Sequence, residues 1–365
     1  MGCWAHGINL WIKDIMKLTW SEDLIQFAKD IINYFRKHQV PLAILRRLQI
    51  EKYGAHIALL LPGQTRWGSA YYCVKNLIKT KVALLNTLHE EGIEMNLQVK
   101  QKILDDSFWQ NLRILCDFLE PFVKFINQLQ SDQPRLSTAY SNLQKIEQLI
   151  VQNSEIPNDV QKKALEFGKS RWSNFLYNPI VMVAYKLDPQ YCGETLDATQ
   201  WDRFLEQEII RMTPENEHDA IIMEYSEYVG KLGGFSDDHL WGNLITKSIN
   251  WWKLVARRYP ILSKIALKVL SIPATSAASE RNWSAFGFIH NKLRNRMLDQ
   301  RVEKCVYLYW NMKILREIKE KIEINVTNEL ENIEIEKDND SNQFNNWFIE
   351  DFDVNELDNE SSDDE

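Results

Sequence analysis

The chain has 365 residues, of which 45% are hydrophobic and 11% aromatic, enough for a sizeable core in one large domain or two small ones. Glycine and proline are scarce, at 13 and 10 residues, which argues against a turn-rich β-sandwich and for long helices. Five dispersed cysteines without a Cys-x-x-Cys pair indicate reduced thiols inside a cell. No apolar run approaches the ~18 residues of a membrane span, so we expect no membrane partner.

The net charge of −8 is unevenly distributed along the chain. Residues 329–365 contain 15 acidic residues and one lysine, whereas residues 1–328 carry a net charge of +6. A basic body is compatible with contacts to phosphates, although ordinary solvated faces explain it equally well. The tail is predicted to be disordered, and its Trp347, Phe348 and Phe352 either dock onto something or belong to a solubilising extension.

Apolar residues recur at steps of three and four between residues 8 and 35 and predict helical structure there. A short apolar run at 57–61, closed by Pro62-Gly63, predicts a buried strand. From about 68 to 240 the pattern is helical again. Its breaks are expected near 132–134, 156–158 and 231–238.

The last part of the chain predicts three more helical stretches. The first, 249–270, contains Pro260, which should break or kink it. The turn-forming residues 271–276 follow, and then helices at about 277–292 and 299–322.

Four short motifs stand out in this order. They are Cys3-Trp4-Ala5-His6 followed by Lys13-Asp14-Ile15; Thr65-Arg66-Trp67; Leu187-Asp188-Pro189; and a long block from Tyr259-Pro260 through Ile272-Pro273-Ala274-Thr275-Ser276 and Ser279-Glu280-Arg281-Asn282-Trp283-Ser284 to Arg294-Asn295-Arg296. Together they resemble the hAT superfamily of transposases, and the last block is similar to the C-terminal dimerisation region of that family.

The resemblance implies a ribonuclease-H-like α/β core interrupted by a large helical insertion. The expected fold class is therefore mostly α with a small β component. The implied domains are a partial core at 1–68, an all-helical insertion at 69–245, the dimerisation region that completes the core at 246–325, and the disordered acidic tail at 326–365.

Transposases of this kind cut DNA with two divalent ions, held by three carboxylates. The resemblance makes Glu280 the third carboxylate and places the first two, both aspartates, before the Cys-x-x-His block. This sequence begins two residues before Cys3, so we expect both aspartates to be absent, Glu280 to be vestigial, and no cofactor to be bound. Alternatively, Glu280 lies near a helix start, where an acid favours the helix dipole.

Two further functions stay open. In one, the chain is a subunit of a Mg²⁺-dependent transposase or nuclease, and another chain supplies the missing carboxylates to join Glu280. In the other, the chain is a non-functional transposon remnant.

Nucleic-acid contacts are implied at two places. Trp67 resembles a family residue that stacks on an extruded base, with Arg66 beside it, or it is a core tryptophan. A second basic set either faces a DNA backbone or forms a solvated helix face: Lys292, Arg294 and Arg296, with Lys253, Arg257 and Arg258. Nuclear localisation follows from the resemblance alone.

Cys3 and His6 form at most half of a structural zinc site, which needs four ligands, so we predict no metal and expect both to be packed.

The region 249–320 holds more large aromatic residues than one buried helix stripe requires. Such an excess favours burial against a partner, in a homodimer or in a heterodimer with related transposases, unless the rings pack on the insertion of the same chain. The predicted interface residues are Trp251, Trp252, Tyr259, Trp283, Tyr309 and Trp310.

Overall fold

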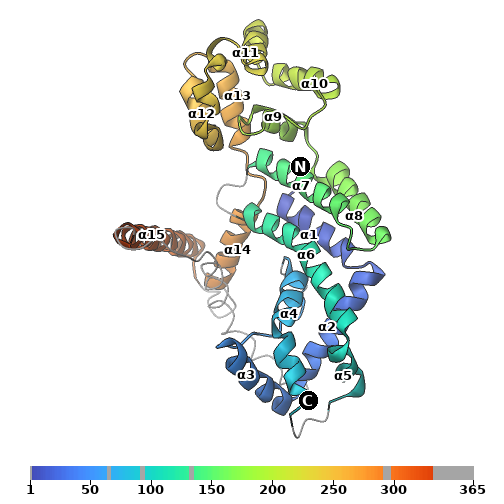
Figure 1. Cartoon of the computed structure of the whole chain (residues 1–365). Coiled ribbons are helices and arrows are strands. Elements are labelled where there is room, and N and C mark those ends of the chain that lie inside the picture. The colour runs from blue at the N-terminus through green and yellow to red at the C-terminus, as the bar shows by residue number, and fades with distance from the viewer. Residues whose placement is uncertain (1, 64–66, 91–94, 131–134, 291–296, 332–365) are drawn as a thin grey trace. The chain divides into compact units, whose positions relative to one another are not determined.

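The computed structural model describes residues 2–63, 67–90, 95–130, 135–290 and 297–331. The chain divides into two units, Met1–Arg281 and Asn282–Glu365. The described residues are mostly helical, as their periodicity predicts (Figure 1). The one β contact among them is an isolated antiparallel bridge between Arg135 and Pro273.

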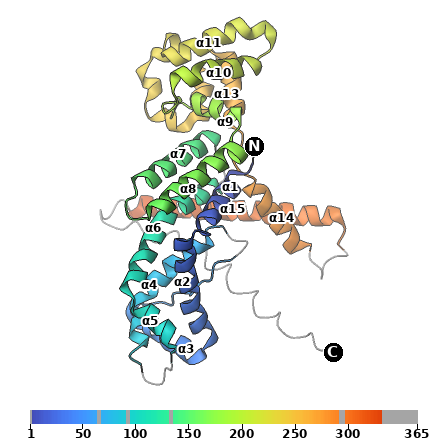
Figure 2. The same cartoon turned by 90° about the vertical axis from the view of Figure 1, so that its right-hand side faces the viewer.

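The first part of unit 1 is a helical bundle in which α1 packs on α6 and α8, and α4 packs on α3 and α6 (Figure 2). Its elements are α1 (Trp4–Ile15), α2 (Thr19–Lys37), α3 (Gln39–Tyr53), α4 (Ser69–Thr87), α5 (Leu97–Leu104), α6 (Asp106–Leu129), α7 (Leu136–Gln152), α8 (Asn158–Arg171) and the π-helix η1 (Trp172–Leu176). Helices α1 and α8 approach closely because Gly168 has no side chain: a Cβ there would overlap the ring of Trp11. The Trp11 indole donates to the Ala164 carbonyl at 2.7 Å.

Helix ends follow local capping chemistry. The Asn96 and Asp105 side chains accept from the backbone N–H groups of Gln98 and Ser107, and so begin α5 and α6. Helix α3 ends at Gly54, whose φ of 75° is readily adopted only by glycine. These ends are the kind of boundary that sequence alone can indicate.

The second part of unit 1 gathers α9 to α13 beside α7 (Figure 1). Its elements are α9 (Pro179–Leu187), α10 (Ala198–Arg211), η2 (Glu215–Glu217), α11 (His218–Gly230), the 3-10 turns η3 (Gly233–Ser236), η4 (Asp238–Trp241) and η5 (Asn243–Lys247), α12 (Ser248–Val255) and α13 (Pro260–Leu270). Pro260 is the first residue of α13, so the predicted break is confirmed.

The strand predicted at 57–61 is wrong. These residues have no regular secondary structure and pair with no strand in the described part of the chain. Instead, the buried Gln49 side chain takes both backbone groups of Ile57: its Nε2 donates to the Ile57 carbonyl at 2.9 Å, and its Oε1 accepts from the Ile57 N–H. Asn76 donates to the Ala58 carbonyl. Because side chains satisfy the backbone here, no sheet is needed. The predicted ribonuclease-H-like core is therefore not confirmed.

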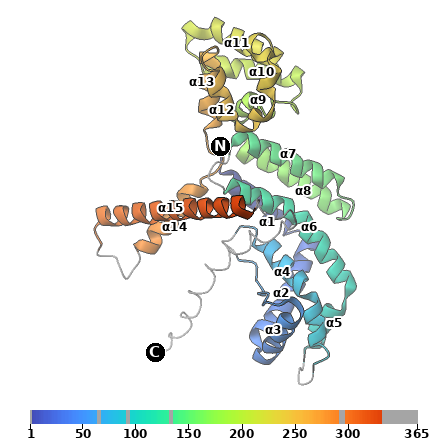
Figure 3. The same ribbon diagram turned by 60° about the vertical axis from the view of Figure 1, so that its left-hand side comes forward.

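Unit 2 contains most of α14 (Ala277–Ile289) and all of α15 (Asp299–Glu331), and α15 crosses α14 at an angle (Figure 3). Helix α15 is longer than the predicted 299–322. It takes in residues 326–331, so the first part of the predicted disordered tail is helical. The rest of that tail, and the domain boundaries drawn from the sequence, stay predictions. Among the described residues, no helix is both long enough and apolar enough to cross a bilayer.

Candidate interaction surface

Three of the six predicted interface aromatics lie in a buried cluster within unit 1. Trp251 and Trp252 are each 0% exposed. Together with Tyr259 they pack against Tyr228, Phe235 and Trp241. Phe235 stacks on Tyr259 with ring centroids 4.1 Å apart. We call these six residues the aromatic cluster.

Polar atoms of the aromatic cluster are paired inside the chain. The Trp251 and Trp252 indoles donate to the carbonyls of Leu240 and Leu187, each at 2.7 Å. The Tyr259 hydroxyl donates to the Glu227 carboxylate at 2.6 Å and accepts from the Gly234 N–H. Trp251, Trp252 and Tyr259 are therefore interior residues of unit 1 and are not available to the predicted interface.

The other three predicted aromatics lie in unit 2 and are accessible. Trp283 is 72% exposed, Tyr309 is exposed, and Trp310 is half-buried. Further large apolar residues are exposed around them: Phe286, Phe288, Leu298, Tyr307, Leu308, Met312, Ile314 and Leu315. An apolar surface of this extent is typical of a binding face.

Helix α15 carries two apolar stripes on opposite sides. Val302, Val306 and Trp310 recur every four residues and are buried or half-buried. Leu308, Met312 and Leu315 recur at steps of four and three, and are 57%, 61% and 64% exposed. Leu308 follows Val302 by six positions, which places the two stripes about 120° or more apart around the helix. We call Leu308, Met312 and Leu315 the outer stripe.

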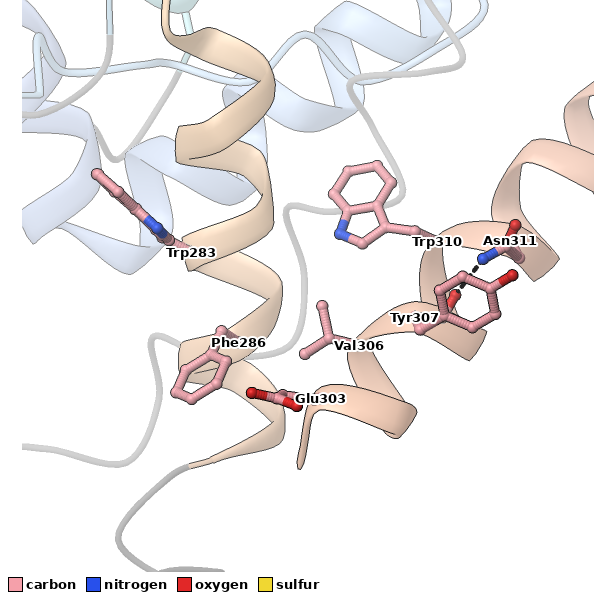
Figure 4. A pocket seen from close by; sticks show the side chains of 7 residues that line it. All are labelled: Trp283, Phe286, Glu303, Val306, Tyr307, Trp310 and Asn311. Carbon is pink, nitrogen blue, oxygen red and sulfur yellow. Dashed lines mark hydrogen bonds between the residues drawn. The ribbon is translucent and has the colours of Figure 1, made fainter. Parts of the chain in front are cut away.

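An apolar groove lies between α14 and α15 (Figure 4). It measures about 390 Å³ and is lined by Trp283, Phe286, Glu303, Val306, Tyr307, Trp310 and Asn311. The Trp310 indole N–H is buried and has no hydrogen-bond partner among the residues that the structure describes. Unit 2 therefore has two apolar features, the groove and the outer stripe.

Residues 234–312 match the family model described as the hAT family C-terminal dimerisation region. The chain contains a hAT dimerisation region. Zinc finger BED domain-containing protein 4 of Homo sapiens is 21% identical over 355 residues, which cover 86% of this chain. The chain spans 29% of that relative's length. These similarities relate the chain to the hAT transposases.

The hAT match begins in the aromatic cluster and ends in α15, so it covers parts of both units. In its unit 1 part, four of the five Phe, Tyr and Trp residues are buried, whereas its unit 2 part has the groove and the outer stripe. Sequence analysis did not single out Leu308, which is exposed on α15. Leu308, Met312 and Leu315 recur at helical spacing on a different side of the helix from Val302 and Val306. This spacing could have indicated a second apolar stripe from the sequence.

The other predicted hAT site residues are placed as follows. Arg66, Lys292, Arg294 and Arg296 lie outside the described residues. Trp67 is half-buried in the turn before α4, where it packs against the hydrophobic core. Glu280 lies in α14, but its side chain is outside the described part of the structure. Among the described side chains, no group of three or more His, Cys, Asp or Glu residues is arranged to hold a metal ion.

Cys3 and His6 of the hAT-like Cys-x-x-His block differ in burial, since Cys3 is half-buried and His6 is exposed. Cys3 is half-buried at the start of α1, and its Sγ lies 3.2 Å from the Thr275 Oγ1. Burial opposes ionisation of Cys3, but hydrogen bonds from Ser276, Thr275 and the His6 backbone outweigh it and lower the thiol pKa. His6 is exposed beside Phe175, so the expectation that it is packed in the core is wrong. The block joins the start of α1 to the segment before α14, and the Trp4 N–H also donates to the Ala274 carbonyl.

Asp188 of the hAT-like Leu-Asp-Pro motif is completely buried. Its two oxygens accept hydrogen bonds from the hydroxyls of Ser137 and Ser248, each at 2.6 Å. One of them also accepts from the Gln190 N–H at 3.0 Å, and Arg135 donates to Ser248. Since Ser137 lies in α7 and Ser248 begins α12, this carboxylate joins three helices at the end of α9. Sequence analysis found the motif but not this role.

Proposed function

We propose that this is a transposase-derived protein that self-associates through the outer stripe of α15. The supporting observation is that Leu308, Met312 and Leu315 form one exposed stripe within a hAT dimerisation region. A helix that is apolar on opposite sides is expected to be covered on both. The partner is a second copy of this chain or a related hAT protein.

The double substitution Leu308→Lys/Met312→Lys is expected to make the chain monomeric. Burying each of these side chains contributes about 1.5–3 kcal/mol, so losing both should raise the dimer Kd at least ~100-fold. Size-exclusion chromatography with light scattering at tens of micromolar measures this. Leu149→Lys/Val151→Lys on exposed α7 positions is the control and should remain dimeric. A monomeric wild-type chain at that concentration would contradict the proposal.

We also propose that the chain contacts duplex DNA through phosphates. Residues 239–279 contain six lysines and arginines and no acid, although the whole chain is negative. Lys253, Arg257, Lys264 and Lys268 are exposed on or next to α12 and α13, and none of them takes part in an ion pair among the described residues. Cations without internal partners are available to a nucleic-acid backbone.

For DNA binding, Lys253→Glu/Arg257→Glu is expected to weaken affinity at least ~10-fold and to reduce the slope of log Kd against log salt by about two, since each phosphate contact contributes ~0.9. Fluorescence anisotropy with a labelled duplex at several salt concentrations measures both quantities. The matched variant Lys162→Glu/Lys163→Glu makes the same charge change on exposed positions of α8. Equal losses of DNA affinity in the two variants would mean that only the net charge of the chain matters. That outcome would contradict a specific DNA-binding face on α12 and α13.

We further propose that the chain alone does not cleave DNA, because the resemblance supplies Glu280 without its two companion aspartates. No nicking of supercoiled plasmid is expected with Mg²⁺ or Mn²⁺. Nicking that appears with either ion and disappears in Glu280→Gln would instead favour the transposase subunit. Because its proposed partner is DNA, we propose that this protein is located in the nucleus.

A further inference from the structure

The acidic tail contains a compact apolar segment. Residues 332–365 hold 13 acids and one lysine, yet five large apolar residues fall within nine positions: Phe344, Trp347, Phe348, Ile349 and Phe352. A purely solubilising tail does not need such a concentration of aromatic side chains, which are typical anchors for apolar pockets.

The groove between α14 and α15 has the matching chemistry. Val306 and Trp310 point from α15 toward α14, whereas the Trp283 ring extends away from α15 (Figure 4). The buried Trp310 N–H lacks an acceptor within the described residues. Buried indole N–H groups normally have one, and a carbonyl or carboxylate of a docked segment would supply it once the neighbouring side chains move apart to admit the segment.

Charge favours the same pairing. Residues 282–321, which include most of α14 and about the first two-thirds of α15, hold nine lysines and arginines and four acids, a net charge of +5. Of these cations, Arg301 and Lys304 are exposed within one turn of the groove residues Glu303 and Val306. An acidic segment is therefore attracted to this part of unit 2, whereas a neutral apolar segment would not be.

The chain is long enough for the segment to return. Trp310 lies 21 residues before the end of α15 at Glu331, which is about 32 Å along the helix. Trp347 follows Glu331 by 16 residues, and an extended chain of that length spans up to about 53 Å. The segment can thus reach the groove of its own chain.

We propose that residues 344–352 dock in the groove between α14 and α15 of the same chain. Their aromatic side chains fill the apolar space beside Phe286 and Val306, and the segment accepts a hydrogen bond from the Trp310 indole. The flanking acids lie near Arg301 and Lys304. This site is on the other side of α15 from the outer stripe, so it goes beyond the proposed self-association and does not depend on it.

Hydrogen exchange of the full-length chain, followed by mass spectrometry, tests the docking. Trp347→Ser/Phe348→Ser/Phe352→Ser should raise the exchange rate of residues 301–312 by about 5-fold or more, because an uncovered helix opens more readily. The control Val354→Ser/Leu357→Ser, in the same tail but outside the segment, should leave exchange unchanged. Equal exchange in the wild type and the triple variant would overturn the proposal.

A second measurement tests whether the tail segment itself binds and whether it binds in the groove between α14 and α15. A labelled peptide of residues 341–355 is added to the full-length triple variant, and anisotropy is recorded. Micromolar binding is expected, with at least a 10-fold loss in a variant that also carries Phe286→Glu. Equal binding of the same peptide with its aromatic residues changed to serine would show attraction by charge alone, which overturns the groove assignment.

The double variant Leu308→Lys/Met312→Lys separates docking from self-association. Protection of residues 301–312 is expected to persist in it, whatever its oligomeric state. Loss of that protection together with the dimer would assign the segment to a second copy and overturn docking within one chain. Tail-dependent protection at 248–270 instead of 301–312 would also overturn it.

Discussion

Replacing Asp188 by alanine is expected to lower the free energy of unfolding by about 3–5 kcal/mol, the cost of breaking a buried charged network. The carboxylate accepts from the Ser137 and Ser248 hydroxyls and the Gln190 N–H. Its loss leaves the buried Ser137 and Ser248 hydroxyls without this acceptor at the meeting point of α7, α9 and α12. Urea denaturation followed by tryptophan fluorescence should report the change, because Trp252 donates to the neighbouring Leu187 carbonyl.

The substitution Asp188→Asn is the matched comparison. An amide has nearly the same shape, and its oxygen still accepts, but its NH₂ group faces a hydroxyl that must now turn its own proton elsewhere. We therefore expect a loss between zero and that of alanine. An asparagine variant as unstable as the alanine variant would mean that the charge is essential. An alanine variant of wild-type stability would refute the structural role.

Trp252→Ala is expected to lower the free energy of unfolding far more than Trp283→Ala. Trp252 is completely buried and its indole is hydrogen-bonded, so its truncation should cost about 3–5 kcal/mol. Trp283 is 72% exposed, so its truncation should change the free energy of unfolding by about 0.5 kcal/mol or less. Urea denaturation of both variants, with circular dichroism as the signal, measures the contrast.

The comparison is matched because the same residue type is removed from the same hAT dimerisation region. A large loss for Trp283→Ala would show that its ring is covered within the native protein. Near-equal stability of Trp252→Ala and the wild type would mean that the aromatic cluster does not hold α12 in place.

Local features of this fold were predictable where one residue decides the outcome. Pro260 cannot continue a preceding helix, and α13 begins there. The apolar run 57–61 was misleading because a short apolar run does not by itself determine whether its backbone pairs in a sheet, and these residues are only half-buried or exposed. The choice was made by Gln49, a residue of α3 whose side chain pairs with the backbone of Ile57. The residues of the run do not by themselves indicate the contact between Gln49 and Ile57.

Composition and periodicity predict that this protein is mostly helical and where several of its helices break, and its motifs resemble those of the hAT transposases. Which aromatic residues are interior and which are accessible depends on how the helices pack. Trp251 and Trp283 look alike in sequence, since both lie in helices rich in aromatic residues. Periodicity determines which face of a helix is apolar, but what covers that face depends on residues distant in the chain, such as Phe235 and Tyr228 for Trp251.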